Sequence, residues 1–278
     1  MKTIYYNLFL IFLIISNHSN AQQYNDTIPK HETFTIQSTN LQELRTINVW
    51  TPLEYETNLD SLPVLYMPDG GIEEDFPHIA NTLAELIKNK KIEPIILVGI
   101  ENTQRRRDLT GITNVEKDKE IAPVVGGSEN FRSFISDELF FEINKRYRTT
   151  NKKGIIGESL AGLFIIETFF MKPDLFDYYI AFDPSLWWNN KFLIKKASKN
   201  SNYLLATQKA LWFGSSKEAS KIIGKFANIL KEKNFKNLNW EYYRQLEKFE
   251  KDKDPPGIVC FYGRQYLLRY RELKASNH

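Results

Sequence analysis

GIIGESLAG, residues 154–162, is the stretch that decides the fold of this chain. An apolar segment leads into Gly157-Glu158-Ser159, and a helix-forming pattern starts at Leu160. A buried strand that enters a G-x-S-x-G turn and leaves it as a helix places the serine on a tight elbow, where only small neighbours fit. Ala161 stands in place of the last glycine and keeps that position small. This context predicts Ser159 as a nucleophile, whereas the simpler alternative is a serine that caps a helix N-terminus.

The segments on either side of the elbow alternate between strand and helix patterns. Dense runs of apolar and β-branched residues are typical of buried parallel strands, and apolar residues spaced three or four apart indicate helices. This order predicts the α/β class, with an α/β-hydrolase fold whose mostly parallel central sheet carries helices on both faces. The expected strands are a hairpin over 31–50 and single strands at 63–67, 94–100, 154–157, 178–183, 209–214 and 240–243, and the expected helices are 77–90, 129–147, 160–171 and 217–233.

Two backbone N–H groups are candidates for an oxyanion hole. Leu160 follows the serine, and at this type of turn its N–H points to the place where an oxyanion forms. The second donor is expected in the loop after the strand at 63–67, which reads Pro68-Asp69-Gly70-Gly71. Glycine lets the backbone approach a ligand closely, so the N–H of Gly70 or Gly71 is the candidate. The alternative interpretation of this loop is an ordinary Asp-Gly turn.

The start of the chain has the layout of a cleavable secretory signal. Lys2 precedes an apolar run at 4–15, and small residues stand at the −3 and −1 positions of a cut after Ala21. The run is shorter than the roughly 20 residues that span a bilayer, although a retained membrane anchor is the alternative. We therefore expect residues 1–21 to be removed, with no membrane insertion afterwards, and the protein to be periplasmic or secreted. Residues 22–278 are long enough to bury a substantial core, and we expect them to form a single domain.

Composition argues against several other classes of protein. The formal net charge of +3 is small, and no clustered basic face is indicated, which disfavours nucleic acid as a partner. Cys260 is the only cysteine, so neither an intramolecular disulfide nor a cysteine-cluster metal site is expected. Because no dinucleotide-binding fingerprint occurs either, the sequence implies no cofactor and no metal.

Several further motifs follow one another in an order that resembles a known family. The loop at 69–71 is followed by EEDFPHI at 73–79, by VGIENT at 98–103 and by RRRDLT at 105–110. GGS at 126–128, YRT at 147–149 and DPSLWW at 183–188 continue the series. Over about residues 31 to 243 the chain resembles the esterase family of α/β hydrolases that includes the siderophore esterases for enterobactin and salmochelin.

This resemblance implies hydrolysis of a small-molecule carboxylic ester through an acyl-serine intermediate. Ser159 would attack, and the N–H groups of Gly70 and Leu160 would hold the oxyanion. Arg106, in the arginine run, is the expected contact for an anionic or oxygen-rich substrate, although an arginine in this run could instead pair with a carboxylate. Trp187 is expected to line the pocket, against the alternative that both tryptophans at 187–188 belong to the core. Glu158 takes the place of the histidine that often precedes the serine in relatives.

The acid of a catalytic triad is expected in the loop after the strand at 209–214. That loop reads Ser215-Ser216-Lys217-Glu218, and Glu218 is the candidate. In chain order the acid stands between the serine and the histidine, as in other hydrolases with this elbow. The alternative is a solvated glutamate at the start of a helix.

The histidine base is missing from the place where the resemblance puts it, which is after the last core strand. The segment from about 244 is atypical of the family, and the chain holds only His18, His31, His78 and His278. His18 falls in the signal, His31 lies near the start of the mature chain, and a terminal residue rarely supplies an oriented base. Three explanations stay open: an altered C-terminal segment, a replacement base such as His78, or a non-catalytic ligand-binding protein that kept the fold.

Overall fold

The computed structural model of this chain describes residues 27–199 and 205–244. The signal expected at 1–21, the atypical segment after 244 and His278 lie outside the described residues.

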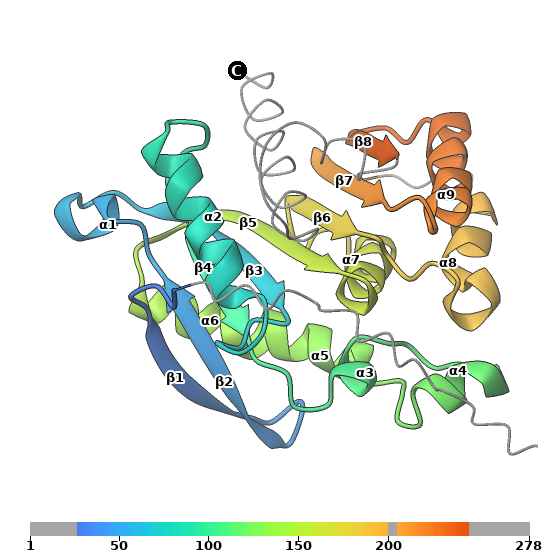
Figure 1. Ribbon diagram of the computed structural model, residues 1–278, viewed down its shortest axis with the longest axis horizontal. Helices are drawn as coiled ribbons and strands as arrows, with labels where there is room; N and C mark the ends of the chain where they lie inside the picture. The colour runs from blue at the N-terminus through green and yellow to red at the C-terminus, as the bar shows by residue number, and fades with distance from the viewer. Residues whose placement is uncertain (1–26, 200–204, 245–278) are drawn as a thin grey trace, which may run out of the picture.

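One sheet organises the described part of the chain, and Figure 1 shows it as a twisted layer. Its strand order is β1-β2-β4-β3-β5-β6-β7-β8. The hairpin strands β1 and β2 are antiparallel, β2 is antiparallel to β4, and every later pair is parallel. The strands are β1 Glu32–Ser38, β2 Glu43–Trp50, β3 Leu62–Pro68, β4 Ile96–Ile100, β5 Thr149–Glu158, β6 Tyr178–Phe182, β7 Lys209–Ser215 and β8 Leu238–Arg244.

Two apolar cores show which helices cover each face of the sheet. On one face α2 packs against alternate residues of the central strands, including Leu65, Leu97 and Ile156. On the other face the helices from α5 onward pack against the intervening residues, such as Tyr66, Val98 and Ile155. The helices are α1 Glu54–Thr57, α2 Phe76–Lys88, α3 Arg105–Asp108, α4 Glu116–Ile121, α5 Ser128–Ser133, the π-helix η1 Phe134–Leu139, α6 Phe140–Arg146, α7 Leu160–Met171, α8 Trp188–Lys199 and α9 Ser220–Lys233.

The architecture expected from the sequence is confirmed. The hairpin, the parallel strands and α2, α7 and α9 fall close to their predicted positions, and helices cover both faces. The helix expected at 129–147 consists of α5, η1 and α6 in direct succession. Helix α8 was not predicted. Its first turn does not have helical backbone angles, because Asn189, Asn190 and Lys191 have φ of 46°, 50° and 61°. In the described ranges, no helix is long and apolar enough to cross a membrane.

Candidate active site

Ser159 lies on a strained elbow between β5 and α7. Its φ of 57° and ψ of −112° fall outside the regions that an L-residue ordinarily adopts, and such a residue costs on the order of 1–3 kcal/mol. The turn is fixed by hydrogen bonds from Ser159 N–H to the Phe182 carbonyl at 2.9 Å and from Leu163 N–H to the Ser159 carbonyl at 2.9 Å. The elbow predicted from the sequence is therefore present, with its serine at the carboxyl end of the central parallel strand.

The small residues around the serine are required by close packing. A Cβ on Gly157 would lie 2.5 Å from the Ala161 Cβ. A Cβ on Gly162 would lie 2.9 Å from the Phe182 carbonyl oxygen of the neighbouring strand. Because both approaches are shorter than van der Waals contact allows, no larger residue fits at either position without moving the backbone. The two glycines of the pattern G-E-S-L-A-G are thus a steric requirement of this turn.

The Leu160 backbone N–H and the Ser185 side chain lie beside the nucleophile. Leu160 is the first residue of α7, where a backbone N–H has no partner within the helix. Ser185 donates its N–H to the Ser159 carbonyl at 3.1 Å, and its Oγ lies 3.4 Å from the Ser159 Oγ. Ser185 is only 5% exposed. This contact was not predicted, because it depends on the loop after β6 folding back over the elbow.

The glycine loop after β3 does not offer the oxyanion donor expected at Gly70. The Gly70 N–H donates to the Ile100 carbonyl at 3.0 Å, as an extension of the β3–β4 ladder. Gly70 is instead required for close packing, since a Cβ there would lie 2.3 Å from the Gly99 Cα. The Gly71 N–H is also engaged and donates to the Glu74 Oε2 at 2.7 Å. The assignment of Gly70 to the oxyanion hole is therefore corrected: its backbone N–H is committed to the sheet.

Acidic side chains gather around the elbow. Burial, together with the negative charges of Asp75 and Asp183, raises the pKa of the Glu158 carboxyl to about 7. Burial also raises the pKa of Asp75 to about 6, together with the charge of Asp69. Arg105 partly offsets this charge through a two-pronged ion pair with Asp69, with Nε–Oδ1 at 2.6 Å and Nη2–Oδ2 at 2.8 Å. Glu158, the residue directly before the nucleophile, is therefore about half protonated at neutral pH.

We expect stability to fall as the pH rises from about 4.5 to about 7, because of Glu158. Its pKa is higher in the folded chain, about 7, than the ordinary value of 4.5. Between these two values the folded state binds more protons than the unfolded state, so raising the pH favours unfolding; above about 7 this contribution is constant. Urea titrations give the unfolding free energy at each pH. The decrease in this free energy between about pH 4.5 and about pH 7 should be smaller in Glu158→Gln than in the wild type by roughly 2 kcal/mol. An unchanged pH slope in the variant would show that Glu158 does not carry the effect.

With this geometry in place, comparison with known proteins identifies the family. The family model Esterase, described as "Putative esterase", matches residues 38–223. The chain belongs to this family. It is 32% identical over 154 residues to ferri-bacillibactin esterase BesA of Bacillus subtilis, a match that covers 48% of this chain and 51% of BesA. It is 35% identical over 77 residues to a siderophore enterobactin esterase of Emericella nidulans, covering 27% of this chain and 25% of that protein.

A solved structure confirms the α/β-hydrolase fold of this esterase-family chain. An IroE-like serine hydrolase from Shewanella oneidensis superimposes with a TM-score of 0.72 at 24% identity, covering 87% of this chain and 79% of that one. At this identity the likeness concerns the fold. The matches to curated relatives span about half of BesA and a quarter of the fungal esterase, so the activity of this chain is taken up as a proposal below.

The three arginines of the family's RRRDLT stretch have three different environments. Arg105 pairs with Asp69, and Arg107 pairs with Glu43 and Asp108, each at 2.7 Å. Arg106 is exposed, and in the described part of the chain no ion pair involves it. Two of the arginines are therefore structural, which is the alternative raised by the sequence. Arg106 is exposed, and its contact with substrate stays a prediction.

The two adjacent tryptophans differ in their exposure to solvent. Trp187 is 41% exposed, which suits a residue that contacts substrate, and Trp188 is 5% exposed and packs in the core. Their rings meet edge to face, with centroids 5.8 Å apart.

Two acidic residues, Glu218 and Asp183, lie at the loop where the acid of a triad was expected. Glu218 is exposed in the loop between β7 and α9. Asp183, which follows β6, reaches into that same loop and accepts a hydrogen bond from the Ser216 N–H at 2.6 Å. Asp183 was not predicted as a site residue, although an acidic residue directly after a parallel strand is a usable signal. Its φ of 39° is a further mark of a special position.

Of the two described histidines, His31 directly precedes β1 and His78 lies on α2. His31 contacts the Pro29 carbonyl through Nδ1 at 2.7 Å and stacks edge to face on Phe76. His78 lies on α2, one turn after Asp75, and its charge lowers the pKa of that carboxyl. Through Asp75 it is coupled to the acidic cluster at the elbow. Within the described residues there is also no group of three or more His, Cys, Asp or Glu side chains that could hold a metal ion.

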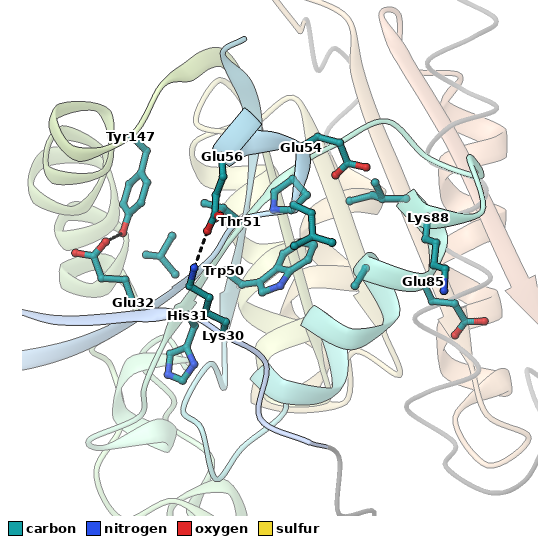
Figure 2. Close-up of a pocket in the computed structure, with 15 residues that line it drawn as sticks. Lys30, His31, Glu32, Trp50, Thr51, Glu54, Glu56, Glu85, Lys88 and Tyr147 are labelled. Atoms are coloured by element: carbon teal, nitrogen blue, oxygen red, sulfur yellow. Dashed lines mark hydrogen bonds and ion pairs between the residues drawn. The ribbon is translucent and has the colours of Figure 1, made fainter. Parts of the chain in front are cut away.

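A cavity of about 870 Å³ lies away from the nucleophile. Figure 2 shows its lining, which includes Lys30, Trp50, Glu54 and Lys88. These residues come from the segment before β1, the end of β2, α1 and the end of α2. In the antiparallel register Trp50 pairs with Leu97 near the start of β4. The cavity therefore lies near the amino-terminal ends of the parallel strands, whereas Ser159 follows the carboxyl end of β5. The volume of this cavity therefore does not make it the site of the chemistry.

Proposed function

We propose that this protein is an exported serine hydrolase that cleaves a small-molecule carboxylic ester through an acyl-Ser159 intermediate. The observation that carries the proposal is the strained elbow, with φ of 57° at Ser159 and the Leu160 N–H directly beside it. Maintaining such a conformation costs stability, and strained positions of this kind persist mainly at functional sites. Membership of the esterase family supports the same chemistry.

On this proposal, Ser159 Oγ attacks the ester carbonyl carbon while its proton passes to a base. The carbonyl oxygen becomes an oxyanion that accepts a hydrogen bond from Leu160 N–H, an interaction typically worth about 3–4 kcal/mol of barrier. Collapse of the tetrahedral intermediate expels the alcohol with a proton, and water then attacks the acyl-serine to release the acid. Glu218 is the proposed triad acid. His78 or His278 would supply the base.

The proposed substrate class is an oxygen-rich ester of the siderophore type. The curated relatives are named as esterases of ferri-bacillibactin and enterobactin. In this chain Arg106 offers an exposed guanidinium and Trp187 an exposed indole. A guanidinium binds carboxylate and other anionic oxygens through several donors at once, and an indole ring packs on planar groups.

Labelling with a fluorophosphonate probe tests this function. The folded protein should form one adduct, mapped by mass spectrometry to the peptide that contains Ser159, and Ser159→Ala should abolish it. Ser198→Ala is the matched control, because Ser198 is an exposed serine on α8, and it should label at the wild-type rate. Absence of an adduct on Ser159 in the folded protein would defeat the proposal.

A second candidate function is that of a catalytically impaired or non-catalytic ligand-binding protein of the same fold. The specific observation in its favour is that residues 245–277 contain no histidine. A hydrolase that loses its base retains roughly 10³–10⁴-fold acceleration over water from the remaining site. In the same labelling experiment, an adduct on Ser159 combined with negligible ester turnover would favour this second function.

A further inference from the structure

A second cavity, of about 280 Å³, runs along the helix that carries the nucleophile. Its α7 wall is formed by Leu163, Glu167 and Met171, which stand four, eight and twelve residues after Ser159. Residues at this spacing lie on one face of a helix. The cavity therefore follows the face of α7 that begins with Ser159, and α5 and α8 supply much of the remaining wall.

A buried ion pair lies in the wall of this cavity. Glu167 Oε2 accepts hydrogen bonds from Ser128 Oγ at 2.6 Å and from Arg132 Nη1 at 2.7 Å. Glu167 and Arg132 are 8% and 7% exposed. The other oxygen, Oε1, lies over Gly111, where a Cβ would approach it to 2.6 Å. Among the described residues no hydrogen bond reaches Oε1, so this oxygen is available as an acceptor.

A buried donor belongs to the same cavity. Trp188 lines it and is 5% exposed. The Trp188 indole Nε1–H is buried, and no hydrogen-bond partner for it occurs in the described ranges. Buried polar groups are nearly always paired, so an unpaired one calls for a partner from outside the chain. Glu167 and Trp188 thus supply one acceptor and one donor.

The cavity wall at the start of α8 is strained and clamped. Three successive residues have left-handed backbone angles, with φ of 46° at Asn189, 50° at Asn190 and 61° at Lys191. This conformation is disfavoured for residues other than glycine. The buried Asp118 holds this segment, because its Oδ2 accepts hydrogen bonds from Asn189 N–H and Thr113 Oγ, both at 2.8 Å. Strain that a buried carboxylate maintains beside a cavity is typical of a ligand site.

We propose that this cavity binds a compact part of the substrate in which an apolar body carries an amide or hydroxyl group. The acceptor atom of that group would take the Trp188 Nε1–H, and its donor would reach Glu167 Oε1. Apolar contacts come from Leu163, Phe192 and Leu193. A net charge on the bound group is disfavoured, because Arg132 and Glu167 already neutralise each other. Only the assignment to the substrate rests on the proposed function.

Benzamide, an aromatic ring that carries one amide, is a suitable probe of the full chain. In Ser159→Ala protein with ¹⁵N-labelled tryptophan, benzamide should shift the Trp188 indole resonance saturably, with the resonance assigned from Trp188→Phe. In a competition assay, Trp188→Phe should weaken benzamide about tenfold, as expected for the loss of one hydrogen bond. Trp240→Phe, on β8 and outside the cavity lining, is the matched control and should leave the affinity unchanged.

Three results would overturn the proposal. They are no saturable shift of the Trp188 resonance, an equal loss of affinity in Trp240→Phe, or equal binding of ethylbenzene, which has the ring without the amide. The link to the substrate has its own readout, because benzamide should slow fluorophosphonate labelling of wild-type Ser159. Binding without slower labelling would overturn that link. Retained benzamide binding in a protein that never labels would instead reject the serine-hydrolase function and leave the pocket standing.

Discussion

Gly70→Ala is expected to lower the free energy of unfolding by about 3 kcal/mol or more, although the change adds only one methyl group. The added Cβ would lie 2.3 Å from both the Gly99 Cα and the Ile100 N, which are backbone atoms of the adjacent strand β4. A flexible side chain can move away, but β4 lies in the centre of the sheet between β2 and β3. The methyl group can therefore be accommodated only by separating β3 from β4.

Urea unfolding of the purified variant measures this loss. Gly224→Ala is the matched control, because Gly224 lies inside α9 and a Cβ there meets nothing closer than 3.7 Å. Alanine is favoured over glycine in a helix interior, so this control should gain up to about 1 kcal/mol. If Gly70→Ala were as stable as the wild type, the close approach of the loop to β4 would be wrong, and with it our correction of the oxyanion assignment.

Local sequence was sufficient to predict the elbow and most of the sheet. The turn at 157–162 is determined by contacts between residues close in sequence, such as Gly157 with Ala161. Buried parallel strands are continuous apolar runs, which can be recognised without knowing their neighbours. These features therefore need no knowledge of the tertiary structure.

The features that the sequence did not predict all depend on contacts between distant segments. Ser185 reaches Ser159 only because β5 and β6 pair side by side. The Gly70 N–H donates its hydrogen bond to the carbonyl of Ile100, thirty residues later in the chain. Three adjacent arginines look equivalent in sequence, and only the folded chain distinguishes the exposed Arg106 from the two that are paired. Partner choice, rather than residue type, separates a structural residue from one that can bind a ligand.

Asp108→Ala is expected to lower the free energy of unfolding by about 3–5 kcal/mol, the usual cost of removing one partner of a buried ion pair. Arg45 has no exposed side-chain surface and Asp108 is 1% exposed, and they meet at 2.7 Å. Asp108 also accepts a hydrogen bond from Arg107 Nε at 2.7 Å. Among the described residues, its removal would leave the buried Arg45 charge with Glu43 as its one charged partner, at the place where α3 is attached to β2.

The control for this prediction is an ion pair of the same length in a different environment. Lys30 and Glu56 also meet at 2.7 Å, but their side chains are 88% and 58% exposed. Lys30→Ala should therefore change the unfolding free energy by less than about 1 kcal/mol, because water screens an exposed pair. Asp108→Asn, which keeps the shape and loses the charge, should fall between the two. Equal losses for the buried and exposed pairs would mean that α3, and with it the Arg105–Asp69 contact beside the elbow, is not held by the buried charges.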